Sequence, residues 1–88
     1  MAERTATIGS PVGLHARPAA IFTRAAEDSG IQVRISKNGS VPQDAASILG
    51  VMTIGAKYGD TVTLHAEGAR AERVLEELAE LLSRDLDA

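Results

Sequence analysis

Apolar residues follow two different periodicities along this chain, and the order in which they alternate limits the folds open to it. A period of two residues predicts a strand with one buried face, whereas a spacing of three or four residues predicts an amphipathic helix. The strand pattern occurs at residues 5–8, 31–36, 40–43 and 61–67, and the helical pattern occurs at residues 16–27, 47–53 and 69–84. The chain is therefore predicted to run strand, helix, strand, strand, helix, strand, helix.

Half-polar strands interleaved with amphipathic helices predict an α+β protein of two layers, an open-faced sandwich whose helices cover one face of the sheet. Asn38-Gly39 predicts a two-residue hairpin turn between the second and third strands, because both positions accept a positive φ. Pro42 has no backbone N–H for a central ladder, so the third strand is expected at an edge of the sheet. Right-handed crossovers would leave room for the last strand between the first and the second.

The same spacing indicates which side chains form the core. On the first helix, Ala19, Phe22 and either Ala25 or Ala26 are expected to face inward, with Arg24 near the outer face. His65 falls on the polar face of the last strand and is predicted to be a solvated strand residue. The other inward positions are predicted to be Val62, Leu64, Ala66, Ala71, Val74, Leu75, Leu78, Leu81 and Leu82.

The length and composition of the chain predict one domain over residues 1–88. A chain of this size buries roughly 60 to 65% of its unfolded surface, which leaves no room for a second catalytic lobe. Cysteine is absent, so disulfides and thiolate metal sites are excluded, and a reducing cytoplasm is the expected compartment. Neither an apolar secretory segment nor a run of membrane-spanning length occurs, so no membrane insertion is expected.

Charge and motif content argue against several classes of function. A formal net charge of −3, with one Tyr and one Phe, does not suit binding to nucleic acid, which needs a basic stripe or a stacking platform. No Walker-type loop, Gly-rich kinase loop or metal-ligand cluster occurs, so neither a cofactor nor a metal is expected. If the protein handles phosphate, another protein must deliver it.

Residues 13–18 read Gly-Leu-His-Ala-Arg-Pro and place a histidine at the start of the first helix. Proline is tolerated in a first helical turn, so Pro18 indicates a helix that begins near Ala16 and puts His15 at the N-cap or first position. The free N–H groups of Ala16 and Arg17 and the positive end of the helix dipole would then receive a phosphoryl group carried by the ring. Arg17 adds a permanent cation whose planar fork matches phosphate oxygens.

Histidine chemistry suits a carrier of phosphate. An unperturbed imidazole titrates at about pH 6.5, so the neutral ring is a nucleophile and the protonated ring is a good leaving group from phosphorus. The simpler alternative is that His15 only caps the helix or points into solvent. That alternative requires Gly13, Arg17 and Pro18 to stand beside it by coincidence.

The hexapeptide Gly13–Pro18, continued by Ala19-Ala20 and followed by Ser47-Ile48-Leu49-Gly50-Val51-Met52, resembles the HPr family of histidine-containing phosphocarriers of the bacterial sugar phosphotransferase system. The resemblance spans the whole chain and implies the sheet order 1-4-2-3. It implies that Enzyme I, which draws on phosphoenolpyruvate, phosphorylates His15 at Nδ1, and that His15 passes the group to sugar-specific IIA proteins. It also implies a phosphocarrier without autonomous enzymatic turnover, which we expect to be a monomer.

The short helix over residues 47–53 is the candidate docking surface for these partners. It carries more apolar surface than two helical turns can bury on one side, so some of it should pack on the sheet and at least one side chain should be exposed. The resemblance implies that partners dock on this helix, with Arg17 and Arg24 as a charged rim. The apolar docking candidates are Ile48, Leu49, Val51 and Met52.

Ser47 has two interpretations. It is a natural N-cap for the short helix, worth about 1 kcal/mol. The resemblance also makes it a possible target of HPr kinase/phosphorylase, although Ala45-Ala46 precede it where relatives commonly carry a lysine. Glu27 and Gly50 likewise stand where relatives often carry lysine, which weakens the expected basic rim.

Three alternatives stay open on sequence grounds. A nitrogen-branch HPr paralogue would share the chemistry and differ in its partners. An α+β regulatory binding module would never carry phosphate and would keep its activity without His15. A phosphohydrolase with a histidine intermediate would need a second acid, base or metal, and the sequence offers no candidate.

Overall fold

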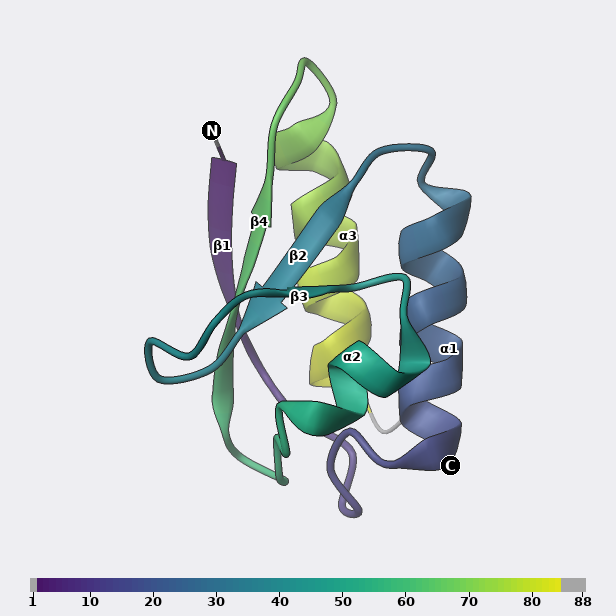
Figure 1. The fold of residues 1–88 in the computed structure, drawn as a ribbon, viewed down its shortest axis with the longest axis vertical. Helices are drawn as coiled ribbons and strands as arrows, with labels where there is room; N and C mark the ends of the chain where they lie inside the picture. Colours follow the sequence, from purple (N-terminus) through teal and green to yellow (C-terminus); the bar gives the residue numbers. More distant parts are fainter. Residues whose placement is uncertain (1, 85–88) are drawn as a thin grey trace.

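The computed structural model describes residues 2–84 and shows the predicted order of elements (Figure 1). The helices and strands are β1 (Ala2–Thr7), α1 (Ala16–Asp28), β2 (Val33–Ser36), β3 (Gln43–Asp44), α2 (Ile48–Thr53), β4 (Thr61–Ala66) and α3 (Ala71–Ser83). The predicted helices and three of the predicted strands are present with ends that differ by a few residues, and the third strand is reduced to Gln43–Asp44. No helix in this part of the chain combines the length and apolar character needed to cross a membrane.

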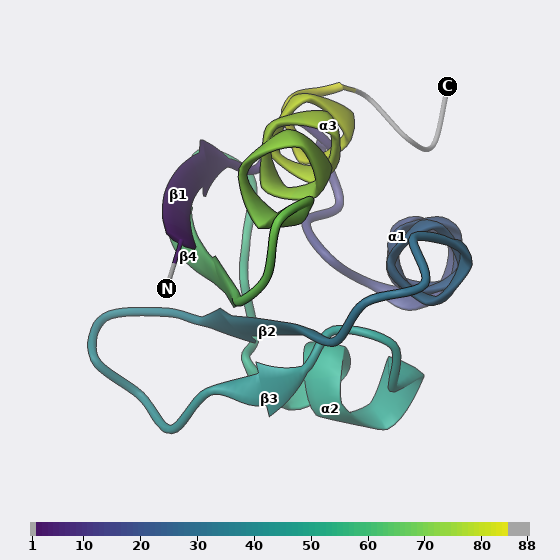
Figure 2. The same cartoon turned by 90° about the horizontal axis from the view of Figure 1, so that it is seen from above.

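The four strands form one antiparallel sheet in the order β1-β4-β2-β3, which confirms both the inserted last strand and the α+β sandwich. In Figure 2 the three helices lie on one side of this sheet, with α3 over β1 and β4. β3 lies at the edge, as Pro42 predicts. The sheet thus leaves one face without helices.

The core lies between the helices and the sheet. On α1 the buried apolar side chains include Ala19, Phe22 and Ala26, so the second alternative of the Ala25 or Ala26 prediction is correct. Thr23 is also buried. Its hydroxyl donates to the carbonyl of Ala20 at 3.1 Å, so burial leaves no unpaired polar group on this side chain. All the predicted inward positions of β4 and α3 are buried except Leu81, which is partly exposed.

The hairpin between β2 and β3 differs from its prediction. Asn38 and Gly39 have φ values of 51° and 75°, and the N–H of Ser40 donates to the carbonyl of Lys37 at 2.9 Å, so a tight turn forms there. The strands do not pair directly beside it, because the nearest cross-strand pair is Ile35 with Gln43, and the predicted two-residue hairpin is therefore wrong. The strand predicted over residues 40–43 does not form, and only Gln43 and Asp44 pair with β2. Pro42 supplies no N–H for a ladder, which is the physical reason for the short edge strand.

β1 begins earlier than its alternation indicates. It was expected over residues 5–8 but runs from Ala2 to Thr7, paired residue by residue with β4 from Ala66 to Thr61. Cross-strand hydrogen bonding extends the strand through Glu3 and Arg4, which break the apolar alternation. Ile8 lies just beyond the strand and is buried, so the chain enters the next loop from a fixed point.

Candidate functional site

The loop before α1 is anchored at both Gly13 and Leu14. Gly13 has a φ of 72°, and a Cβ at that position would lie 2.5 Å from the carbonyl oxygen of Ala56. The position therefore needs glycine, both for its conformation and for the close approach. The N–H of Leu14 donates to the same carbonyl at 2.9 Å, and the Leu14 side chain is buried.

His15 follows this anchor and is the N-cap of α1, as predicted. Its backbone is extended, its carbonyl accepts the N–H of Ala19 at 2.8 Å, and its exposed side chain makes no capping hydrogen bond. Pro18 is buried in the first turn of the helix. The imidazole therefore stands clear of the fold between two buried anchors, Leu14 and Pro18.

The groups beside His15 suit an anion. The N–H groups of Ala16 and Arg17 have no hydrogen-bond partner within residues 2–84, as expected for the first turn of a helix. Arg17 is exposed and forms no ion pair with any described residue. Arg24 is likewise exposed and unpaired in this part of the chain, and it lies seven residues along α1, on the same side as Arg17.

Helix α2 packs beside α1 (Figure 1). Its apolar residues are divided between the core and the solvent. Val51 is fully buried and Met52 packs partly on the core. Ile48 and Leu49 are 45% and 78% exposed. The prediction that part of this apolar surface packs inward and at least one side chain is exposed is confirmed.

Ser47 is the N-cap of α2, as predicted, and its Oγ accepts the N–H of Gly50 at 3.1 Å. The preceding Asp44 accepts the N–H of Ala46 at 2.9 Å through Oδ1. Together these bonds fix how the chain enters α2 from the edge strand. Phosphorylation at Ser47 remains a prediction.

His65, the second histidine, differs from its prediction as a solvated residue. It lies on the helix-free face of β4, where Nε2 is 3.0 Å from the Oγ of Ser36 and Nδ1 is 3.2 Å from Oε2 of Glu3. Only 22% of its side chain is exposed. Both ring nitrogens are therefore engaged, because β4 is a central strand and its neighbours β1 and β2 supply polar partners.

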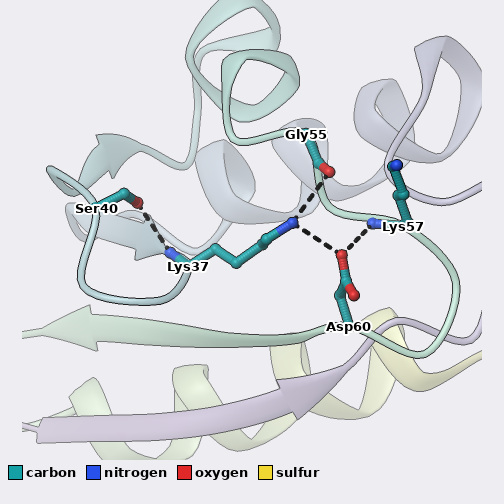
Figure 3. A network of polar contacts seen from close by, with 5 residues as sticks. All are labelled: Lys37, Ser40, Gly55, Lys57 and Asp60. Atoms are coloured by element: carbon teal, nitrogen blue, oxygen red, sulfur yellow. Dashed lines mark hydrogen bonds and ion pairs between the residues drawn. The ribbon is translucent and has the colours of Figure 1, made fainter.

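Sequence reasoning missed the segment that supports the His15 loop. Residues 56–60 lie against that loop, and their shape depends on Asp60 and on Lys37, 23 residues earlier in the chain. Figure 3 shows the network that joins Lys37, Ser40, Gly55, Lys57 and Asp60. No local pattern marks such a pair, because only the fold brings the two residues together.

Among residues 2–84, no group of three His, Cys, Asp or Glu side chains is placed to hold a metal ion. The site consists instead of one exposed imidazole, two free amide groups and a guanidinium. This combination can bind and hold a phosphoryl group through hydrogen bonds and charge.

The comparisons with known proteins point to one family. The sequence model described as the PTS HPr component phosphorylation site matches residues 2–84. The phosphocarrier protein HPr of Streptomyces coelicolor is 45% identical over 87 residues, which covers 99% of this chain and 94% of the relative. The HPr of Cupriavidus necator is 40% identical and covers 94% of this chain and 92% of its own length.

A solved structure agrees with the sequence relatives. The crystal structure of HPr-C-His from Thermoanaerobacter tengcongensis superposes with a TM-score of 0.88 at 35% identity, covering 100% of this chain and 98% of that one. The likeness thus extends over the sheet, the helices and the loop that carries His15.

Proposed function

Because the chain belongs to the HPr family of phosphocarriers of the phosphotransferase system, we propose that His15 is the residue that carries the phosphoryl group. The observation that carries this proposal is the exposed imidazole at the N-cap of α1, with no capping bond of its own. The free N–H groups of Ala16 and Arg17 lie next to it. Proteins of this family are carriers and not catalytic enzymes, so the group must arrive from one protein and leave to another.

The transfer to His15 is an in-line displacement at phosphorus. The lone pair of Nδ1 forms the new P–N bond while the bond from phosphorus to the donor breaks, and the bonding electrons leave with the donor. The amides of Ala16 and Arg17 and the guanidinium of Arg17 stabilise the charge on the phosphoryl oxygens. In the second transfer the acceptor attacks phosphorus, and His15 leaves as an imidazole.

We propose Enzyme I as the donor and sugar-specific IIA proteins as the acceptors, with the exchange taking place in the cytoplasm. Both partners must reach the same imidazole, which its exposure allows. The exposed side chains of Ile48 and Leu49 on α2 provide an apolar contact surface near the site. Arg17 and Arg24 provide positive charge that suits an acidic partner.

Ser47 is a proposed second site, at which HPr kinase/phosphorylase would act. Ser47 is partly exposed at the start of α2, directly before Ile48 and Leu49. A phosphoryl group there would place negative charge beside the proposed docking surface. Regulation would then act on partner binding and not on the imidazole.

The experiment that tests the assignment of His15 uses the two histidines of the chain as a matched pair. Wild type, His15→Ala and His65→Gln are each incubated with Enzyme I and phosphoenolpyruvate, and the intact mass of each is measured at alkaline pH. Wild type and His65→Gln should gain one phosphoryl group, and folded His15→Ala should gain none. Equal labelling of His15→Ala would rule out His15 as the carrier, and no labelling of wild type would favour a binding module.

A further inference from the structure

We infer that Lys37 and Asp60 are positioning residues for phosphoryl transfer, because their ion pair shapes the turn on which the His15 loop rests. This inference depends on the proposed function of His15 for its kinetic consequence. Its structural part, the fixing of the loop, stands on hydrogen bonds of the described residues alone. Neither residue touches the reacting atoms.

The turn at residues 56–60 holds the His15 loop at both ends. At the start of the loop, the N–H of Ile8 donates to the carbonyl of Asp60 and the N–H of Gly59 donates to the carbonyl of Ile8, both at 2.9 Å. At its end, the N–H of Leu14 donates to the carbonyl of Ala56, also at 2.9 Å. A shift of the turn would therefore move the loop that lies between these bonds.

The His15 loop and the turn are in close backbone contact at Gly13. A Cβ at Gly13 would lie 2.5 Å from the carbonyl oxygen of Ala56 and 2.9 Å from Cα of Lys57, so backbone lies directly against backbone. Leu14 is buried next to this contact, and His15 follows it in the chain. A displacement of residues 56 and 57 would thus displace the His15 imidazole, because only Leu14 separates His15 from the contact at Gly13.

A single carboxylate oxygen closes the turn (Figure 3). Oδ2 of Asp60 accepts the N–H of Lys57 at 2.8 Å and the ammonium of Lys37 at 2.9 Å. The N–H of Asp60 donates back to the carbonyl of Lys57 at 2.9 Å. Lys37 also donates to the carbonyl of Gly55 at 3.3 Å, so its ammonium joins both ends of the segment that contains the turn.

The polar contacts of Lys37 and Asp60, which together form the polar clamp of this turn, are not replaced by apolar packing. Lys57, Tyr58 and Gly59 are exposed, and of the residues between Gly55 and Asp60 only Ala56 is buried. The side chains of Lys37 and Asp60 are 22% and 34% exposed, which shields their pair from water more than the other ion pairs between lysine or arginine and carboxylates in residues 2–84. The Lys37 hydrogen bond, followed by the Lys57 N–H, holds the pKa of the Asp60 carboxyl below its usual range.

Loss of this clamp should reduce the rate of transfer more than the affinity for the donor, because the imidazole loses its position while α2 keeps its exposed face. An imidazole that samples several positions spends less time aligned with phosphorus. A role limited to global stability would instead lower the amount of folded protein and leave the rate constant of the folded fraction unchanged. Measuring the saturating rate constant and the half-saturation concentration separately therefore distinguishes a positioning role from a role in global stability.

The experiment compares Lys37→Met, Asp60→Ala and Lys37→Arg with wild type and with Glu77→Gln, a matched control that removes one carboxylate from the Arg73–Glu77 pair on α3. Two quantities are measured at a temperature where every variant is folded. One is the hydrogen-exchange rate of the Leu14 amide in the absence of any partner. The other is the rate constant of transfer from phosphorylated Enzyme I, as a function of the concentration of the chain.

Lys37→Met and Asp60→Ala should each speed exchange of the Leu14 amide by about ten-fold. They should lower the saturating rate constant by about ten-fold and change the half-saturation concentration by less than about two-fold. Lys37→Arg keeps a cation and should stay nearer to wild type, and Glu77→Gln should match wild type in both measurements.

Unchanged Leu14 exchange in both Lys37→Met and Asp60→Ala would overturn the inference, whatever the kinetics show. Faster exchange with an unchanged saturating rate constant would also overturn it, because the loop would then move without consequence for transfer. Failure of the proposed function would look different, since wild type itself would accept no phosphoryl group on His15. In that event the exchange rates alone decide whether Lys37 and Asp60 fix the loop.

Discussion

At the scale of single residues, the two histidines have the same ring and opposite surroundings. His65 engages both ring nitrogens, with Ser36 and with Glu3, on the helix-free face of the sheet. His15 is exposed at a helix N-cap and has no side-chain hydrogen bond within residues 2–84. A nucleophile needs an unengaged lone pair and a path for its partner, and only His15 has both.

Arg17 should matter for transfer and not for folding. It is exposed and forms no ion pair with a described residue, so Arg17→Lys should leave the melting temperature nearly unchanged. The same change keeps the charge but removes the planar fork, and transfer from Enzyme I should slow by about ten-fold. Arg24→Lys, on the same helix, is the control and should have a smaller effect. A large fall in melting temperature with unchanged transfer would mean that Arg17 is structural.

At the scale of elements, α2 is divided between a packed face and an exposed face. Val51→Ala removes a fully buried side chain and should cost about 2 kcal/mol in the free energy of unfolding. Leu49→Ala changes a side chain that is 78% exposed and should leave that free energy within about 0.5 kcal/mol. Chemical denaturation measures both changes, and titration with Enzyme I should show weaker binding for Leu49→Ala. Unchanged binding by both Leu49→Ala and Ile48→Ala would contradict the docking role of α2.

Phosphorylation of Ser47 should act on the same surface. Phosphorylation adds about two negative charges at the N-terminus of α2, where they interact favourably with the helix dipole but repel an acidic partner. Transfer should therefore fall while the melting temperature holds or rises. Ser47→Ala is the control, because it removes the cap to Gly50 without adding charge and should cost about 1 kcal/mol of stability. Transfer that stays at the wild-type rate after phosphorylation would count against regulation through Ser47.

The elements were predictable where their signals are local. Pro18 indicates the start of α1, Ser47 indicates the start of α2, and the structure places both helices accordingly. The return strand after Asn38-Gly39 was not predictable from alternation, because Pro42 limits the ladder to Gln43 and Asp44. The ends of a strand depend on its partner strand, and a single sequence does not show directly which residues of two strands pair.

At the scale of the whole molecule, contacts between distant parts of the chain were the hardest to predict. The order of the sheet follows from crossover rules and from the family resemblance, and the structure confirms it. The place of His15 at the start of α1 was predictable from Pro18, whereas its exposure is a finding of the structure. The ion pair of Lys37 with Asp60 joins two loops, and no sequence pattern links the two residues. The His15 loop depends on this pair because it is hydrogen-bonded to residues 56–60.

The same pair should make the stability of the whole fold depend on pH. The pKa of Asp60 is lowered from its ordinary 3.8, chiefly by the Lys37 hydrogen bond, so its ionised form is favoured in the folded state. This contribution is present above the ordinary pKa and is lost as pH falls through the lower folded value. The difference in unfolding free energy between wild type and Asp60→Asn should therefore be full at neutral pH and vanish in acid.

Thermal or urea unfolding over a series of pH values measures this difference. Asp28→Asn is the control, because Asp28 is exposed and forms no ion pair among the described residues. Its difference from wild type should not follow the same acid transition. A difference for Asp60→Asn that stays constant from neutral pH into strong acid would show that the carboxylate charge does not stabilise the fold.

Peptide fragmentation, after labelling by Enzyme I and phosphoenolpyruvate and digestion at alkaline pH, locates the phosphoryl group on the chain and so tests whether His15 is the carrier. We expect one labelled peptide, with the group on His15, and expect the label to be lost in acid because ring protonation weakens the P–N bond. A label on His65, or an acid-stable label on Ser47, would contradict the assignment of His15 as the carrier.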